Sequence, residues 1–115
     1  IATIMALGDA TSGEKIFKKC VACHSINKGG KNKIGPALYN VVGRTVGGLN
    51  DYKYSKALAS YGKEWTFEEL NGFLQKPASY LKGTKMSYAG LRKEKDRASI
   101  IKYLNKNSDS PKPLP

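Results

Sequence analysis

The chain is poor in the residues that bind metals and carry acid–base chemistry. Its 115 residues include two cysteines, one histidine and one tryptophan, and 9 acidic residues stand against 20 lysines and arginines. A closed zinc site needs four cysteine or histidine ligands, so this chain cannot supply one. A single histidine also leaves none to serve as a separate general base. No stretch alternates convincingly between polar and apolar residues, which indicates an all-α chain.

Long hydrophobic runs are also missing. Ile1 to Leu7 is apolar, but it is far shorter than the ~20 residues that span a bilayer. Residue 1 is not methionine, so we expect a processed or truncated product without a complete signal peptide. We therefore expect membrane contact only through an upstream anchor, if one exists, that this chain does not contain.

The length and the charge narrow the class of protein. A chain of this size predicts one domain, and we expect a monomer. The net charge is +11 at pH 7, which implies acidic partners such as nucleic acid, anionic lipid or an acidic protein surface. The basic residues are dispersed and no nucleic-acid motif is visible, so we expect no nucleic-acid partner. We favour acidic protein faces as partners. Electrostatic attraction between such a face and this basic chain would speed their encounter, and it would weaken as the salt concentration rises.

What the sequence does contain is a five-residue motif, Cys20-Val21-Ala22-Cys23-His24. Two cysteines three apart, with a histidine directly after the second, form the attachment signature of a c-type haem. On a helical turn these positions share one face. The two thiols can therefore reach the edge of the haem, and the imidazole can reach its iron. A redox dithiol would not need the histidine, and a disulfide closing so small a loop would stabilise little.

A c-type haem that only passes electrons needs a second axial ligand on its iron. His24 is the only histidine, which excludes a second imidazole from the same chain. Met5 lies in the apolar start, whereas Met86 lies in a glycine-bounded loop, residues 83–90, with polar neighbours. We favour Met86, because no helical apolar repeat surrounds it, and methionine opposite histidine raises the potential. An open sixth position remains the alternative and would favour peroxidase or gas-sensing chemistry.

The helical signals are short and are separated by large loops. We predict helices from about Thr11 or Ser12 into the motif, over 55–61, over 66–76 and over 93–105. Ser12 and Thr66 are the expected N-caps, and Pro77 should end the third helix. Residues 27–50 lack a sustained period, and wrapping a cofactor would explain so long a loop. The predicted fold is all-α, with about four to five helices and large loops around one covalent haem.

These residues resemble class I, mitochondrial-type cytochromes c over about Gly8 to Asn105. The motifs that carry the resemblance are Gly13 before Ile16-Phe17, Cys20 to His24, Gly35-Pro36-x-Leu38, Gly43-Arg44, Tyr54-Ser55, Trp65, Pro77, Gly83-Thr84-Lys85-Met86 with Ala89-Gly90, Arg97 and Tyr103-Leu104. The apolar start and proline-rich end are most similar to the haem domain of membrane-anchored alphaproteobacterial cytochromes c. We accordingly divide the chain into a lead or linker remnant (1–8), a haem domain (9–107) and a tail (108–115).

The resemblance implies a set of site residues. Cys20 and Cys23 would carry one covalent haem c, with His24 and Met86 as the axial ligands of its iron. The Pro36 carbonyl would accept the Nδ1 proton of His24 and fix the ring. Further residues are expected in three groups: Arg44, Tyr54 and Trp65 as partners of the haem propionates; Phe73, Thr84 and Tyr88 in the pocket; and Lys19, Lys31, Lys33, Lys85, Arg92 and Lys93 at the docking face.

Four positions depart from the mitochondrial pattern. Leu58 and Phe73 stand where those proteins usually carry asparagine and tyrosine, so we expect a less polar environment on the methionine side. Ala78 and Ser79 replace two lysines that are often found at the docking face.

The sequence therefore predicts a one-electron carrier and not an enzyme. By resemblance, it would take electrons from a quinol–cytochrome c reductase and deliver them to a terminal cytochrome c oxidase of a respiratory chain. The expected location is the bacterial periplasm, tethered to the inner membrane, with the mitochondrial intermembrane space as the alternative. Two other functions stay open: a haem peroxidase or sensor with a labile sixth ligand, and a basic module that binds nucleic acid or membrane.

Overall fold

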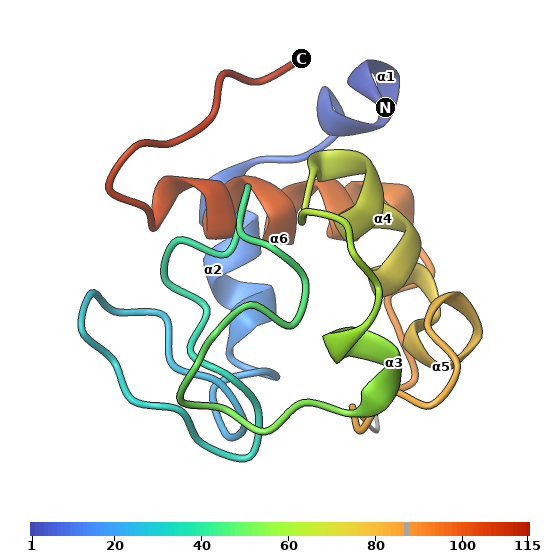
Figure 1. Cartoon of the computed structure of the whole chain (residues 1–115). Coiled ribbons are helices and arrows are strands. Elements are labelled where there is room, and N and C mark those ends of the chain that lie inside the picture. The colour runs from blue at the N-terminus through green and yellow to red at the C-terminus, as the bar shows by residue number, and fades with distance from the viewer. Residues whose placement is uncertain (87) are drawn as a thin grey trace.

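Helices and irregular loops make up the computed structural model, which describes residues 1–86 and 88–115 (Figure 1). The helical segments in that part of the chain are α1 (Ala2–Met5), α2 (Ala10–Phe17), α3 (Lys56–Ala59), α4 (Phe67–Gln75), α5 (Pro77–Tyr80) and α6 (Glu94–Lys106). The described residues form no strand, and an isolated antiparallel bridge joins Thr45 to Glu64. The all-α prediction is confirmed. The described residues form six helical segments, more than the predicted four to five, and the single turns α1 and α5 are the ones that were not predicted.

Side-chain caps mark the starts of α2, α3 and α4. Thr66 caps α4 as predicted, because its hydroxyl accepts a hydrogen bond from the Glu69 backbone N–H at 3.1 Å. The predicted cap of α2 was wrong. Asp9 is the N-cap, since its carboxylate accepts from the Ser12 backbone N–H at 2.8 Å, and the Ser12 hydroxyl donates to the same carboxylate at 2.9 Å. A carboxylate also suits the positive end of a helix.

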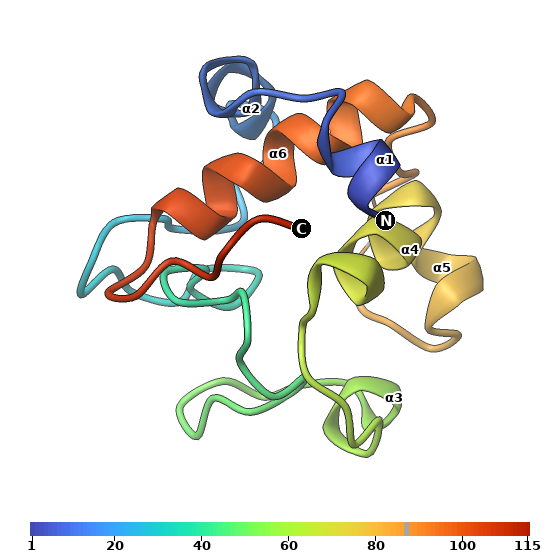
Figure 2. The same ribbon diagram turned by 90° about the horizontal axis from the view of Figure 1, so that it is seen from above.

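The crossing of α2 and α6 forms the frame of the molecule (Figure 2). Gly13 is buried at this crossing, and a Cβ atom there would collide with the carbonyl of Ser99 and come within 2.7 Å of the Tyr103 Cβ. The rings of Phe17 and Tyr103 then pack with their centroids 5.5 Å apart. The close approach fixes the end of α2, from which the cysteine motif continues.

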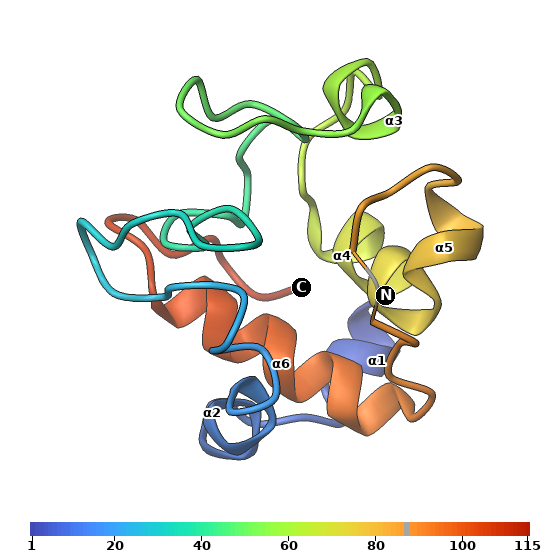
Figure 3. The ribbon, with the colours of Figure 1, turned by 90° about the horizontal axis from the view of Figure 1, so that it is seen from below.

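The loop between α5 and α6, which carries Met86, is held against α4 at its far end. The Leu91 backbone N–H donates to the Leu74 carbonyl at 2.7 Å. Arg97 is buried and donates to the carbonyls of Leu91 at 2.9 Å and Arg92 at 2.8 Å. Viewed from below, this loop, α3 and the loops of residues 27–54 lie on the same side of α6 (Figure 3).

Both ends of the chain lie against the helical frame. Met5 of α1 is only 1% exposed and belongs to the core. The tail after α6 is irregular and is tied back by two bonds between Asn105 and the backbone of Lys112, both 2.9 Å. Asp109 in this tail accepts a hydrogen bond from the Asn40 side chain at 3.0 Å. In the described part of the chain, no helix has the length and apolar character needed to cross a bilayer.

Candidate haem-binding site

A cavity of about 460 Å³ lies between α2, α4, α6 and the loops, within the ~300–1,000 Å³ typical of cofactor sites. Most of the side chains that line it are apolar. The residues around it include eleven with a predicted haem role, namely Cys20, Cys23, His24, Pro36, Arg44, Tyr54, Trp65, Phe73, Thr84, Met86 and Tyr88. The fold therefore brings together residues that are up to 68 positions apart in the sequence (20 to 88).

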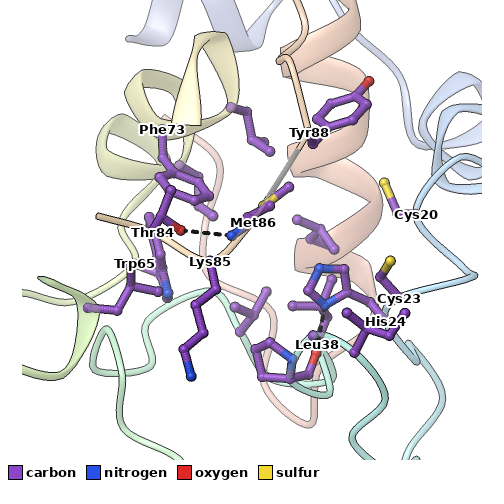
Figure 4. A pocket seen from close by; sticks show the side chains of 18 of the residues that line it. Cys20, Cys23, His24, Leu38, Trp65, Phe73, Thr84, Lys85, Met86 and Tyr88 are labelled. Carbon is purple, nitrogen blue, oxygen red and sulfur yellow. Dashed lines mark hydrogen bonds between the residues drawn. The ribbon is translucent and has the colours of Figure 1, made fainter. Parts of the chain in front are cut away.

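The cysteine motif continues directly from the end of α2. The backbone N–H of His24 donates to the Cys20 carbonyl at 2.9 Å, and that of Cys23 donates to the same carbonyl at 3.0 Å. This turn gathers the two thiols and the imidazole along one side of the cavity (Figure 4). Both thiols are free, and burial, with the nearby charge of Cys23 as a smaller cause, raises the pKa of Cys20.

The imidazole of His24 is fixed in orientation. Its Nδ1 lies 2.7 Å from the Pro36 carbonyl oxygen, and because a carbonyl only accepts, Nδ1 is the donor. The lone pair on Nε2 is therefore available to a metal. Burial lowers the pKa of His24, against the opposing effect of the Pro36 bond, and the Arg44 charge lowers it further. The neutral imidazole, which is the form that binds metals, is favoured.

Met86 faces the same cavity from the loop after α5. Figure 4 shows it across the pocket from His24, beside Thr84 and Phe73. Its backbone N–H donates to the Thr84 hydroxyl at 3.3 Å. The rings of Phe73 and Trp65, which also line the cavity, pack with their centroids 5.1 Å apart. Met5, the other methionine, is not among the described residues that line the cavity.

Arg44 has an unpaired donor at the cavity. Its Nη1 donates to the Tyr39 carbonyl at 3.4 Å, but its buried Nε has no hydrogen-bond partner among the described residues. Burial lowers the pKa of Arg44. The backbone bond from Trp65 N–H to the Arg44 carbonyl, at 2.8 Å, places the two residues together. Since an unpaired buried donor is costly, an anionic group in the cavity would satisfy it, and a haem propionate fits this requirement.

The predicted docking residues do not all meet at the cavity. Lys19 and Lys85 line it, and Lys33 donates through Nζ to the Val21 carbonyl of the cysteine motif at 2.9 Å. The other three, Lys31, Arg92 and Lys93, are exposed but are not part of the lining.

Sequence reasoning assigned no site role to much of the apolar lining. The residues missed in this way include Ile34, Leu38, Val41, Leu70, Leu74, Ile100 and Leu104. Two pairs of these residues could have been predicted to be buried from their spacing in the sequence. Leu70 and Leu74 in α4, and Ile100 and Leu104 in α6, are four residues apart and share a helix face. Such a face predicts burial but does not distinguish a cofactor from protein core.

The comparisons with known proteins agree with this geometry. The family model described as cytochrome c matches residues 10–108. The chain belongs to the cytochrome c family. The resemblance inferred from the sequence motifs is thereby confirmed, and because cytochromes c carry covalent haem, Cys20 and Cys23 stand where such a cofactor requires thiols.

Individual cytochromes c are similar over most of the chain. A cytochrome c homolog of Rickettsia typhi is 48% identical over 104 residues, covering 90% of this chain and 59% of the relative. The homolog of Bradyrhizobium diazoefficiens is 43% identical over 116 residues, covering 100% of this chain and 63% of that protein. The chain thus spans about six-tenths of the length of these relatives.

Shorter relatives are covered almost completely. Cytochrome c2 of Agrobacterium tumefaciens is 46% identical over 100 residues, which cover 84% of this chain and 90% of that protein. The solved structure of cytochrome cH from Methylobacterium extorquens superposes with a TM-score of 0.81 at 40% identity, covering 86% of this chain and 99% of that chain. The small all-α cytochrome c fold is therefore established for this chain.

Proposed function

We propose that this chain is a single-haem electron carrier in which His24 and Met86 ligate the iron. The observation that carries the proposal is that both residues line one apolar cavity and face each other across it (Figure 4), with Nδ1 of His24 bonded to the Pro36 carbonyl so that Nε2 is free. A haem c bound there supplies an iron that exchanges one electron between its ferrous and ferric states. Filling both axial positions favours electron transfer over chemistry at the metal.

The remaining residues have supporting roles in this proposal. The thiols of Cys20 and Cys23 hold the cofactor, and the Pro36 carbonyl orients His24. Arg44 would pair with a propionate, assisted by Tyr54 and Trp65. The apolar lining, with Phe73, Thr84 and Tyr88, excludes water from the iron.

The proposed partners are a quinol–cytochrome c reductase as donor and a terminal cytochrome c oxidase as acceptor. The net charge of +11, together with Lys19 and Lys85 beside the cavity, supports docking to acidic protein faces. The other proposed docking residues are Lys31, Lys33, Arg92 and Lys93. The bacterial relatives support a place in the periplasm. We also propose a membrane anchor outside this chain, because the Rickettsia and Bradyrhizobium relatives are longer than it is.

A haem peroxidase with a displaceable sixth ligand is the alternative. It would need a distal base, and the chain has a single histidine. The relatives described above are named as cytochromes c, which supports the carrier.

Replacement of Met86 tests the proposed ligation. In Met86→Ala we expect the haem to stay covalently attached, while the midpoint potential in a redox titration falls by a large part of the ~0.8 V range that axial ligands span. Met5→Ala is the matched control. It should leave the potential unchanged and lower the free energy of unfolding by about 2–5 kcal/mol, because Met5 is buried in the core. An unchanged potential in Met86→Ala would show that Met86 is not the ligand.

A further inference from the structure

A carboxylate of α4 joins two tyrosines outside the haem pocket. Oε1 of Glu69 accepts hydrogen bonds from the hydroxyls of Tyr61 at 2.7 Å and Tyr80 at 2.8 Å. The other oxygen lies 4.0 Å from the Lys63 Nζ, and the Glu69 side chain is only 14% exposed. We name Tyr61, Glu69 and Tyr80 the tyrosine clamp. None of its members is among the described residues that line the haem pocket.

The clamp ties three segments of the chain together. Tyr61 follows α3, Glu69 lies in α4, and Tyr80 is the last residue of α5. The Tyr80 ring rests on α4 at Gly72, where a Cβ atom would collide with it and would lie 2.8 Å from its Cζ. Gly72 therefore permits the contact, and Glu69 fixes it through a directional bond.

The loop that carries Met86 begins immediately after Tyr80. Met86 is six residues further on, and the loop returns to α4 at Gly90 and Leu91. That far end is held by the Leu91–Leu74 backbone bond and by Arg97, neither of which involves the clamp. The near end is held by the clamp and by the burial of Leu81, which is 6% exposed. The two ends of the loop thus have separate attachments to α4.

The charge on Glu69 strengthens the near attachment. Hydrogen bonds to an ionised acceptor are roughly twice as strong as neutral ones. Burial acts to raise the pKa of Glu69, but the bonds from Tyr61 and Tyr80 and the Lys63 charge outweigh it and hold the pKa below its ordinary value. Burial and the bond to Glu69 raise the pKa of Tyr80. Both shifts keep an ionised acceptor opposite protonated donors.

We propose that the tyrosine clamp positions the methionine loop on α4 and so limits how often Met86 leaves the iron. The inference rests on the proposed His24 and Met86 ligation. An external ligand can take the sixth position only in molecules whose Met86 has left. The apparent affinity of that ligand is therefore proportional to the fraction of molecules whose Met86 has left the iron. Weakening the clamp raises that fraction without touching the pocket.

Imidazole binding to the ferric, haem-loaded full chain measures this fraction. We expect Glu69→Ala to tighten the apparent affinity for imidazole about tenfold, equivalent to about 1.4 kcal/mol. Tyr80→Phe should act in the same direction. Glu69→Gln should fall between native and Glu69→Ala, because an amide oxygen still accepts both bonds but carries no charge. Glu68→Ala is the matched control, since Glu68 is exposed on the same helix, and it should leave the affinity unchanged.

A second readout does not depend on ligand binding. Two backbone hydrogen bonds lie at the near end of the loop. The Leu81 N–H donates to the Pro77 carbonyl at 3.0 Å, and the Thr84 N–H donates to the Leu81 carbonyl at 3.1 Å. We expect their hydrogen exchange to accelerate in Glu69→Ala and not in Glu68→Ala. Ile101→Val, in the core of α6, separates positioning from general stability. It should lower stability while leaving imidazole affinity and these two exchange rates unchanged.

The outcomes distinguish this inference from the function on which it rests. Met86→Ala should bind imidazole far more tightly than the native chain. If it does and Glu69→Ala and Tyr80→Phe do not, the clamp has no positioning role and the ligation proposal stands. If Met86→Ala binds imidazole as the native chain does, Met86 is not the ligand and both proposals fail. A loss of stability in Glu69→Ala with unchanged affinity and exchange would also overturn the inference.

Discussion

At the scale of single residues, Gly35 lies against the ring of His24. A Cβ atom at residue 35 would collide with the imidazole, at 2.7 Å from Nδ1 and 2.8 Å from Nε2. We expect Gly35→Ala to displace the ring from its bond to Pro36 and to lower the free energy of unfolding by about 1–3 kcal/mol. Because the ring would no longer present Nε2 in the same direction, the haem absorption spectrum should change as well. Chemical denaturation and the visible spectrum of the purified protein measure the two effects.

Gly29→Ala is the control for this substitution. Nothing lies within 4 Å of a Cβ at residue 29, but its φ of 75° disfavours alanine. We expect a cost of about 1–2 kcal/mol from the backbone alone, with an unchanged spectrum. Equal spectral changes in both variants would mean that the spectral change in Gly35→Ala does not come from a collision with the His24 ring.

Some site residues could be predicted because a local motif specifies them. The spacing of Cys20, Cys23 and His24 is set by one helical turn and is visible in the sequence. The contact of Gly35 with His24 and the unpaired Nε of Arg44 are not visible, because they depend on where loops lie in space. The sequence motifs indicated that Gly35 and Arg44 matter but not what each one touches.

At the scale of elements, the α2–α6 crossing depends on the absence of a side chain at Gly13. A Cβ there would meet the backbone carbonyl of Ser99, and neither helix can move aside without disturbing the core. We expect Gly13→Ala to lower the free energy of unfolding by about 3 kcal/mol or more, at the upper end of overpacking costs. Thr11→Ala, on the exposed side of the same helix, should change it by less than about 0.5 kcal/mol. Denaturant titration of the two variants would detect the difference, and equal stabilities would contradict the close crossing.

The tyrosine clamp makes part of the stability depend on pH. The pKa of Glu69 lies below its ordinary value of 4.5 in the folded chain, so the folded state favours the ionised form. The resulting stabilisation is fully present above that ordinary value and is lost as the pH falls through the lowered pKa. The difference in unfolding free energy between native and Glu69→Gln should therefore be largest near neutral pH and shrink in acid. A difference that grew in acid would mean that Glu69 is not stabilised as a carboxylate.

The helices differ in how well the sequence specified them. The cap of α4 was predicted because Thr66 precedes a clear apolar repeat. For α2 the sequence predicted Ser12, whereas the cap is the carboxylate of Asp9. The single turns α1 and α5 contain four residues each, too few to show a helical period. Their helical form depends on packing, as the burial of Met5 and Pro77 shows.

At the scale of the whole molecule, the loops are ordered around the haem pocket. Residues 27–50 were predicted to lack regular structure because they have no period, and they contain no helix. Their path could not be predicted, because single bonds between distant residues fix it. Examples are the Gly43 N–H to Trp65 carbonyl bond at 2.8 Å and the hydrogen bond of Asn40 to Asp109 in the tail. These loops contribute residues to the lining of the pocket, which agrees with a covalent haem enclosed by them.

Both the total positive charge and its position on the surface should affect the rate of electron transfer to a partner. We expect Lys19→Glu and Lys85→Glu to slow electron transfer with a redox protein that has an acidic docking face, by about tenfold at low salt, because both residues line the pocket. Lys106→Glu changes the net charge by the same amount at the end of α6, away from the pocket lining, and should slow the reaction much less. Stopped-flow rates as a function of ionic strength measure the effect, and all three variants should converge at high salt, where the attraction is screened. Equal slowing by all three at low salt would mean that net charge alone steers the encounter and that Lys19 and Lys85 do not mark the docking face.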